Sequence, residues 1–403
     1  MAGPECLLVD GAIVRQNSAV LASGARMDLR HGSLAAFCLG AIYFACSLAG
    51  YGNDYDTYAM VRSGQNLLNG LGYSPSRAPG YPIPEIVIGA TSKIGGSTFS
   101  NAISVALALG SLSLFYLLAS RLVEPDRAGF AVLFVALNPV FVVAASSTMD
   151  YVYSIFFILA AVHALASDRF TLAALLSGLA LGSRLSNALI VLVLYLAVIM
   201  FHYLDGNRRQ ALRVFASGIL GVLVTAILFV PVFIASGHTL GFLTYAIGDW
   251  TFIENVARFL YKNLYLFGVA FFVGLALVLG LGEARALYTV NRDRFGLLLI
   301  GLALVLQGLF AKAPLEIEYL IPFIFIVGLA LARALKATAR ILLLGLVASY
   351  SFININLLDI EYDMSKAQAV GAKFRVSLGK GYLTEDLYRR SATEKRYRDY
   401  LRD

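Results

Sequence analysis

The stretch that decides the fold is NALIVLVLYLAVIMFHY, residues 187–203, which contains no Asp, Glu, Lys or Arg. A helix needs about twenty apolar residues to cross the hydrocarbon core of a bilayer, and this segment approaches that length. Similar runs recur along the 403-residue chain, which is 59% hydrophobic and only 14% charged. A soluble domain is about half apolar and about a quarter charged. We therefore predict an all-α polytopic membrane protein.

About eleven apolar segments are candidate spans by this criterion. They cover residues 34–50, 99–120, 128–145, 151–166, 170–185, 187–203, 212–235, 264–282, 295–311, 318–334 and 341–357. Ser47-Leu48-Ala49 resembles a signal-peptide cleavage site, but a long polar segment precedes the first span, so we predict an uncleaved anchor. The predicted organisation is a disordered cytoplasmic leader (1–32), a transmembrane domain (33–357) and a short, basic polar tail (358–403).

The distribution of Lys and Arg between the loops predicts the orientation. The richer set of loops carries Arg121, Arg127, Arg169, Arg208, Arg209, Arg213, Arg285, Arg292, Arg294, Arg333, Lys336 and Arg340. These loops are expected in the cytoplasm, which places the loops 51–98 and 236–263 on the outer side. Eleven spans would put the tail outside as well, whereas an even number would put it inside. The net charge of +7 is explained by these loops and the tail rather than by nucleic-acid binding.

The two outer loops are expected to contain interfacial helices. In the first loop, residues 57–69 form an amphipathic pattern that Gly70 stops, and the Gly- and Pro-rich residues 72–82 cannot form a regular helix. The apolar segment 84–94 is too short to span and is expected to lie in the interface. The second loop has the aromatic anchors of an interfacial helix. These are Trp250, Phe252, Phe259 and Tyr261.

Three aspartates mark the predicted outer boundary of the membrane. Asp54 and Asp56 directly follow the first span, and two residues at this spacing point the same way on an extended segment. Such a pair suits a general base or a divalent-cation site. Asp150 lies at the same level, at the start of the span 151–166. For each of the three, helix capping is the alternative.

Several cations are expected at the same level. Arg184 interrupts the apolar region 170–203, so it requires a partner, a cavity or a lipid phosphate unless it snorkels to the headgroups. Lys312 forms a polar cluster with Glu316 and Glu318, where capping is again the alternative. The remaining cations of this face include Arg77, Lys93 and Lys262. The cysteines and histidines have no metal-ligand spacing, and the Asp54/Asp56 pair could act with or without a divalent cation.

Carboxylates and cations at one membrane face suit transfer of a sugar from a polyprenyl phosphate. The lipid would lie in the bilayer, a carboxylate would accept the proton of the acceptor hydroxyl, and Arg or Lys would stabilise the departing phosphate. Phosphate leaves as an anion, so a strong general acid is not required, in contrast to hydrolytic carboxylate pairs.

An ordered set of motifs resembles the GT-C superfamily of membrane glycosyltransferases that use lipid-linked sugars. The branch resembled most is that of bacterial protein mannosyltransferases and lipid A aminoarabinose transferases. The motifs run from residue 54 to residue 322. They are Asp54-Tyr55-Asp56-Thr57-Tyr58, Gly70-Leu71-Gly72-Tyr73, Ala78-Pro79-Gly80-Tyr81-Pro82, Asn138-Pro139, Asp150, Gly182-Ser183-Arg184 and Glu318-Tyr319-Leu320-Ile321-Pro322.

The resemblance implies roles for particular residues. It makes Asp54 or Asp56 the catalytic base, Asp150 the second acidic residue and Arg184 the basic residue that follows a small-residue span. The family often has a basic residue before the late Tyr-Leu-x-Pro segment, where this chain has Glu316 and Glu318, so Lys312 is the expected substitute. The full set of expected substrate- or phosphate-binding residues is Arg77, Lys93, Arg184, Lys262, Lys312, Tyr58 and Tyr81.

We therefore expect a GT-C-like glycosyltransferase in the bacterial inner membrane, with its site on the outer face and with inversion at the anomeric carbon. Its partners would be a polyprenyl-phosphate sugar and a lipid, glycan or protein acceptor. The alternatives are a secondary transporter or lipid flippase, and a polysaccharide polymerase or ligase. Transporters favour paired halves and charges near the midplane, and the pattern of residues 54–82 has no second copy.

Overall fold

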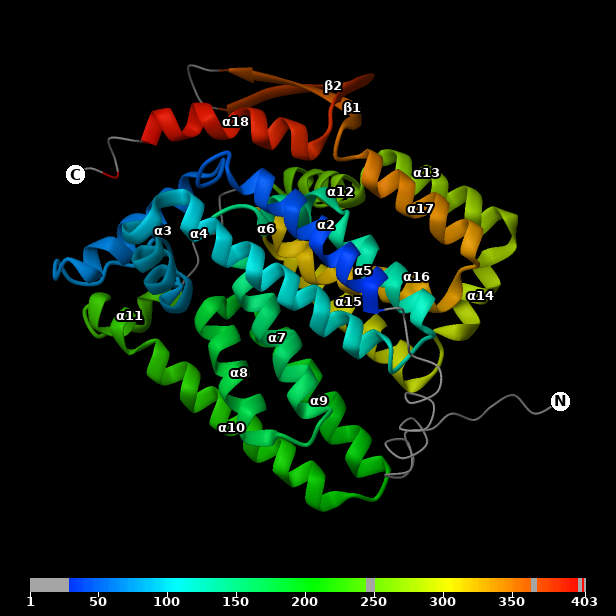
Figure 1. The fold of residues 1–403 in the computed structure, drawn as a ribbon, viewed down its shortest axis with the longest axis horizontal. Coiled ribbons are helices and arrows are strands. Elements are labelled where there is room, and N and C mark those ends of the chain that lie inside the picture. The colour runs from blue at the N-terminus through cyan, green and yellow to red at the C-terminus, as the bar shows by residue number, and fades with distance from the viewer. Residues whose placement is uncertain (1–28, 244–250, 364–367, 398–400, 402–403) are drawn as a thin grey trace.

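Apolar helices make up most of the computed structural model, which describes residues 29–243, 251–363, 368–397 and 401. Most of the predicted leader and Trp250 lie outside the described residues. The helices form a bundle, and a β-hairpin and a final helix lie across one end of it (Figure 1). The prediction of a helical, multi-pass membrane protein is confirmed.

Six helical segments among the described residues are long and apolar enough to cross a membrane. They are α4 (Pro82–Ala119), η1 and α9 (Leu185–Leu204), α10 (Arg208–Leu228), α13 to α14 (Val269–Val290), α15 (Arg294–Lys312) and η4 with α16 (Ile317–Ala334). The pair α5 (Pro125–Ala136) and α6 (Pro139–Ala145), bent by 69°, is a seventh if it forms one span. Four shorter apolar helices are α2 (Leu29–Ser47), α7 (Tyr151–Leu165), α8 (Phe170–Ser183) and α17 (Ala337–Ser349). The number of eleven spans stays a prediction.

The bend between α5 and α6 follows from Asn138-Pro139. Proline cannot continue a helix, but it is suited to the first helical position, and Pro139 begins α6. Asn138 caps α6 by accepting from the backbone N–H of Val140 at 3.0 Å. Its Nδ2 also donates to the carbonyl of Leu266 at 2.8 Å, so the buried break is satisfied by hydrogen bonds.

The first outer loop has the predicted helices with shifted boundaries. The amphipathic helix α3 covers Tyr55–Leu68, two residues earlier than expected, and Gly70 follows it with φ of +76°. The predicted short helix 84–94 is the first part of α4. Gly95 and Gly96 have non-helical backbone angles, and they separate it from the longer part of α4.

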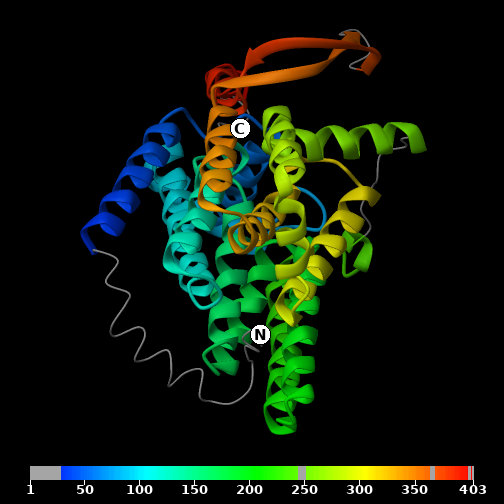
Figure 2. The ribbon, with the colours of Figure 1, turned by 90° about the vertical axis from the view of Figure 1, so that its right-hand side faces the viewer.

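The second outer loop also contains the expected amphipathic helix. The short helix α11 (Val230–Ala235) precedes the loop, and η2 (Leu240–Leu243) lies within it. The amphipathic helix is α12 (Phe252–Phe267), which starts at a capping box formed by Thr251 and Glu254. In Figure 2, α12 lies across the direction of the long helices. Phe252, Ile253 and Leu260 are exposed along it, which is the pattern of a helix that lies in a membrane interface.

The tail is more structured than the sequence analysis expected. The predicted span 341–357 is wrong at its end, because α17 stops at Ser349 and β1 (Ile353–Asp363) begins four residues later. It pairs antiparallel with β2 (Gln368–Lys380), with Ile355 opposite Leu378, and α18 (Tyr382–Tyr397) follows. The alternation of apolar and polar residues in Ile353-Asn354-Ile355-Asn356 is typical of a strand and not of a membrane-spanning helix.

The polar contacts separate two ends of the bundle. Loops of the richer basic set contact one another: Arg294 pairs with Asp205 at 2.9 Å and Arg333 with Asp293 at 2.5 Å. No ion pair among the described residues joins this set to the loops that carry Asp54 and Asp150. The tail helix α18 lies at the end of Asp54, where Thr393 contacts Asn53. Because the tail helix and Asp54 lie at the same end of the bundle, the chain between them must cross the membrane an even number of times.

A close approach of α3 and α4 supports the loop that carries Asp54. A Cβ on Gly64 would lie 2.7 Å from the Cα of Gly89, so a larger residue at position 64 would force the two helices apart. We expect Gly64→Ala to destabilise the protein by about 1–3 kcal/mol through overpacking. Thermal unfolding in detergent measures this, with Gly129→Ala as the control because a Cβ at Gly129 meets nothing within 4 Å. Equal melting temperatures of the two variants would contradict the prediction.

Candidate active site

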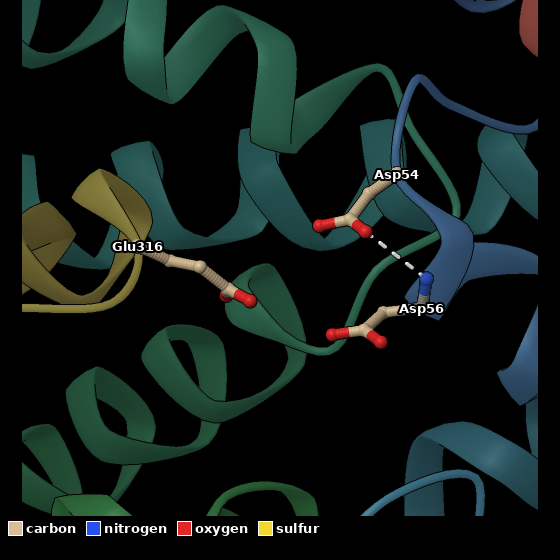
Figure 3. A group of neighbouring side chains, drawn as sticks. All are labelled: Asp54, Asp56 and Glu316. Carbon is tan, nitrogen blue, oxygen red and sulfur yellow. Dashed lines mark hydrogen bonds between the residues drawn. The ribbon is translucent and has the colours of Figure 1, made fainter. Parts of the chain in front are cut away.

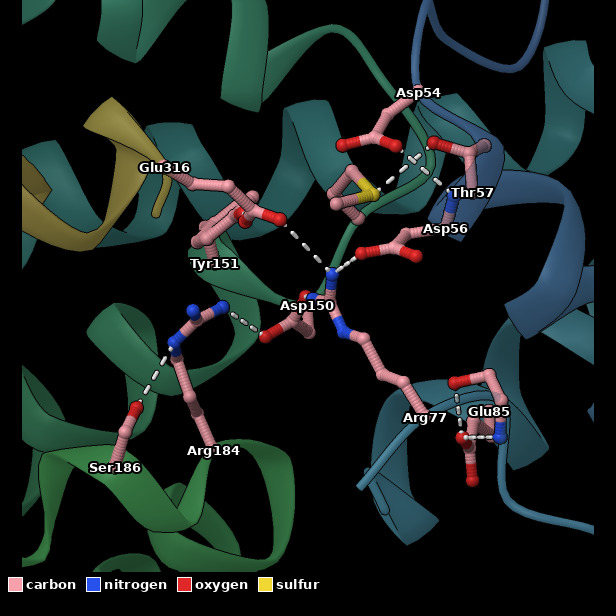
Figure 4. Close-up of polar contacts among 12 residues, drawn as sticks. Asp54, Asp56, Thr57, Arg77, Glu85, Asp150, Tyr151, Arg184, Ser186 and Glu316 are labelled. Atoms are coloured by element: carbon pink, nitrogen blue, oxygen red, sulfur yellow. Dashed lines mark hydrogen bonds and ion pairs between the residues drawn. The ribbon is translucent and has the colours of Figure 1, made fainter. Parts of the chain in front are cut away.

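A buried carboxylate, Asp150, lies between two guanidinium groups (Figure 4). Its Oδ1 is 2.9 Å from Nη2 of Arg77, and its Oδ2 forms an ion pair with Nη1 of Arg184. Asp150 occupies the position before α7, yet its side chain makes no capping hydrogen bond. The capping alternative is therefore wrong for Asp150, and its charge is compensated by the two arginines instead.

Arg184 is held in place by the end of α8. The chain leaves the helix there in an extended conformation, with φ of −159° and ψ of 99°. The guanidinium lies 4.3 Å from the ring centroids of both Tyr151 and Tyr319, and Nε donates to Ser186 Oγ at 3.2 Å. Arg184 is only 3% exposed, so the snorkelling alternative is wrong. These contacts use Nε and Nη1 of the guanidinium and both of its faces.

Arg77 reaches the same carboxylate from the loop between α3 and α4. Glu85, a fully buried carboxylate of α4, accepts hydrogen bonds from the backbone N–H of Ser76 at 2.8 Å and from the hydroxyl groups of Ser76 and Tyr73. These bonds hold the loop next to α4 and orient the neighbouring Arg77. The ring of Tyr81 lies 4.7 Å from the Arg77 guanidinium, so the predicted site residue Tyr81 is part of the cluster.

Three further carboxylates line the edge of the cluster. Asp54, Asp56 and Glu316 have oxygen atoms within 4.8 Å of one another (Figure 3). Arg77 forms an ion pair with Asp56 and lies 3.5 Å from Glu316. Carboxylate oxygens can hold a divalent cation. Two of the three carboxylates that could hold a cation, Asp56 and Glu316, already contact Arg77, so a cation would compete with Arg77 for them.

The cap of α3 is Asp54 rather than Asp56. Asp54 Oδ1 accepts from the backbone N–H of Asp56 at 3.1 Å, whereas the Asp56 side chain pairs with Arg77. The capping alternative therefore holds for Asp54 and not for Asp56. Because the cap uses one oxygen of Asp54, the other remains to face the cluster, as Figure 4 shows.

The environment raises the pKa of Asp54 to about 6. Asp54 is exposed, but the protein atoms near its carboxylate remove part of its hydration, and this loss of hydration is the largest cause. The negative charge of Glu316 adds to the effect, and Arg77 opposes it. Asp54 is therefore a carboxylate that changes protonation near neutral pH, as a general base does.

Lys262 approaches the same region from α12. Its Nζ donates to the carbonyl of Leu315 at 2.6 Å, directly before Glu316. Burial lowers the pKa of Lys262, and the charges of Glu318 and Glu316 oppose this change. Lys262, rather than Lys312, is thus the late cation that lies beside these glutamates.

A narrow pocket opens between Arg184 and the start of α16. Tyr151, Arg184 and Tyr319 form its polar wall, and Ile155, Ile321 and Pro322 form an apolar one. Glu318 also lines it and accepts a hydrogen bond from Tyr382 of the tail at 2.7 Å, which is a tertiary contact rather than a helix cap. The pocket thus combines a guanidinium with apolar side chains, and its open space is about that of one water molecule.

Three predicted site residues lie elsewhere. Lys93 donates to Asn69 at 2.5 Å beside the end of α3, and Lys312 is exposed and forms no ion pair among the described residues. Tyr58 is fully buried between Tyr51 and Tyr397. The sequence pattern does not show which way the side chains of these residues point.

Four residues of the cluster were missing from the predicted set. Tyr151 and Tyr319 each follow an acidic residue at the start of a predicted span, and this repeated acid–aromatic pair was an available signal. Glu85 is an acidic residue inside an apolar helix, which is a marker of buried polar contacts. Glu316 was predicted to lie in a polar cluster with Lys312 but not to belong to the site, and it accepts a hydrogen bond from Tyr151.

Comparison with solved structures shows which known fold this is. The chain superimposes on ArnT from Cupriavidus metallidurans bound to undecaprenyl phosphate, with a TM-score of 0.56 and 16% identity over 77% of this chain and 60% of that one. The apo structure of the same protein gives a TM-score of 0.55 and 15% identity, over 76% and 60% of the two chains. The fold therefore resembles that of ArnT.

The likeness to the GT-C enzyme ArnT concerns the fold, because the identity is low and the chain spans about three fifths of the length of ArnT. No protein-family model and no curated protein matches the sequence. The predicted resemblance is thus confirmed as a structural one, and the roles of the site residues remain to be proposed.

Removing the shared carboxylate tests how the cluster is held together. Asp150→Asn would leave the buried guanidinium of Arg184 without its counter-charge, whereas Arg77 would keep Asp56 and Glu316, so we expect a destabilisation of about 3–5 kcal/mol. The midpoint of thermal unfolding in detergent measures it. Asp54→Asn is the matched control, because Asn is an equally good cap at a solvent-accessible position. If the two variants unfold at the same temperature, Asp150 does not have this role.

Proposed function

We propose that the protein is a glycosyltransferase that moves a sugar from a polyprenyl-phosphate donor to an acceptor hydroxyl. The observation that carries the proposal is the pair of arginines oriented by buried Asp150, with the titratable carboxylate of Asp54 beside it. The fold supports it, because ArnT, which has this fold, binds undecaprenyl phosphate. We further propose that the site faces the outer side of a bacterial inner membrane.

Arg184 and Arg77 would bind the phosphate of the donor. Asp150 holds both guanidinium groups and neutralises part of their charge, so that the remaining N–H donors can stabilise the charge that develops on the leaving phosphate. Nε of Arg77 is buried without a hydrogen-bond partner among the described residues, so it retains a donor for such a ligand. Lys262 would add positive charge as the phosphate departs.

Asp54 would act as the general base. The acceptor oxygen forms a bond to the anomeric carbon as its proton passes to the Asp54 carboxylate. The bond from the anomeric carbon to the phosphate oxygen breaks, and polyprenyl phosphate leaves as an anion. A single displacement of this kind inverts the configuration at the anomeric carbon. Asp56 is less suited to be the base, because it is already paired with Arg77.

The base assignment predicts a selective loss of transfer. Asp54→Asn removes the proton acceptor while keeping the helix cap, so we expect kcat/KM to fall by about 10²- to 10⁴-fold with an unchanged melting temperature. Transfer of radiolabel from polyprenyl-phosphate sugars in membranes measures it, with exposed Lys312→Gln as the control. Full transfer by Asp54→Asn would exclude this base. Substrate uptake into vesicles without covalent transfer would favour a transporter instead.

The pH dependence provides an independent test. The base must be deprotonated, and its pKa is about 6, so kcat/KM should fall below pH 6 and level off above it. Glu316→Gln removes a negative charge that raises the Asp54 pKa, so the acidic limb should move to lower pH. The pH profiles of the two proteins measure the shift. A limb that moves to higher pH, or does not move, would contradict the assignment.

A further inference from the structure

The tail helix α18 contacts both acidic segments of the candidate site. These segments are residues 50–56, which carry Asp54 and Asp56, and residues 316–319, which carry Glu316 and Glu318. They are about 260 residues apart in the sequence. In Figure 1, α18 lies across the end of the bundle above α2 and α6, with the hairpin on its far side. The contacts of α18 with the two segments have no place in the mechanism above.

The centre of α18 is fixed by Arg390, whose side chain is fully buried. Its Nη1 donates to the carbonyl of Ser146 at 2.7 Å and to that of Cys46 at 3.4 Å. Nη2 donates to Val143 O at 3.4 Å and to Ser146 Oγ at 3.2 Å, and Nε binds Asp386 at 2.6 Å.

The carbonyls that Arg390 binds lie at the ends of α2 and α6, where the helix dipoles are negative. A buried guanidinium is costly unless its donors are satisfied. With acceptors on two helices and on its own helix, Arg390 locks α18 in a single position.

From this fixed centre, the two ends of α18 reach the two acidic segments. At the first end, Tyr382 donates to Glu318 at 2.7 Å, in the wall of the pocket. At the other end, Thr393 donates to Asn53 Oδ1 at 2.9 Å, next to Asp54. Tyr397 lies near this end too, with its ring centroid 5.4 Å from that of Tyr55.

We propose that α18 is a clamp that sets the distance between the two acidic segments, with Arg390, Tyr382 and Thr393 as positioning residues. The clamp touches no substrate, and it acts by fixing Asp54 and Glu318 relative to each other. This inference rests on the proposed transfer reaction. A small displacement of a catalytic group lowers the rate by a large factor. A fixed distance between the two segments would therefore affect transfer, apart from any stability that α18 adds.

Three conservative variants test the clamp at separate points. Tyr382→Phe removes only the hydroxyl that binds Glu318, and Thr393→Val removes only the donor to Asn53. Arg390→Lys keeps the charge but cannot reach acceptors on two helices at once. Tyr388→Phe is the matched control, because Tyr388 lies on α18 with 69% of its surface exposed.

The first readout is amide hydrogen exchange of the purified full chain, which does not depend on activity. Tyr382→Phe should speed exchange in residues 316–320, Thr393→Val in residues 50–58, and Arg390→Lys in both, each by about tenfold or more. Tyr388→Phe should change neither. If Tyr382→Phe and Thr393→Val exchange like the unmodified protein, the clamp is refuted, even where Arg390→Lys does not fold.

The second readout is transfer of radiolabel under conditions where every variant is folded. We expect kcat to fall about tenfold in Tyr382→Phe and Thr393→Val, with the donor KM unchanged, because the base is displaced while the phosphate contacts remain. If kcat is unchanged although the melting temperature falls, α18 only stabilises the fold, and the proposal is overturned. If the unmodified protein transfers no label while exchange responds as expected, the proposed function fails and the clamp stands.

Discussion

The structure of the site depends on the burial of Asp150 between Arg77 and Arg184. Each guanidinium would be costly to bury alone, and so would the carboxylate. Together they bring a loop that follows α3, the start of α7 and the end of α8 to one point. Removing Asp150 takes from Arg184 the carboxylate with which it pairs, whereas Arg77 keeps Asp56 and Glu316. This mutual dependence explains why an arginine can interrupt the apolar region 170–203 of a membrane protein.

The carboxylates of the cluster lie in different environments. Asp150 is fully buried and compensated, so it can orient the arginines but has no access to a substrate hydroxyl. Asp54 keeps contact with solvent, and the surrounding protein and Glu316 raise its pKa to about 6. Two aspartates at the same membrane level can thus have different roles, because burial and neighbouring charge differ at each position.

The polar contacts around the site also connect it to distant parts of the chain. Nδ2 of Asn101 in α4 donates to the carbonyls of Ser47 and Gly50, and Asn101 Oδ1 accepts from the Thr148 hydroxyl at 2.6 Å. Asn101 therefore fixes the segment before Asp54 against the segment before Asp150. The tail helix adds a second connection from the other side through Arg390. A site formed from loops gains rigidity in this way from buried hydrogen bonds.

The apolar runs and the spacing of Lys and Arg were sufficient to predict a helical membrane protein, and the resemblance to a family pointed to Asp54, Asp150 and Arg184, which the structure brings into one cluster. The first of these predictions depends on local composition and on the thickness of the bilayer, both of which are readable along the chain. The expectation that Arg184 requires a partner, a cavity or a lipid phosphate follows from the cost of a lone charge in the membrane.

The tertiary structure alone decided which polar side chains meet. Tyr58, Lys93 and Lys312 lie away from the cluster, whereas Tyr151, Tyr319 and Glu316 contact it. The direction of a side chain depends on helix rotation and on bends such as that at Pro139, which packing between distant segments sets. The return of the tail to the Asp54 end is decided in the same way, by contacts of Arg390 and Tyr382 with residues that lie far from them in the sequence.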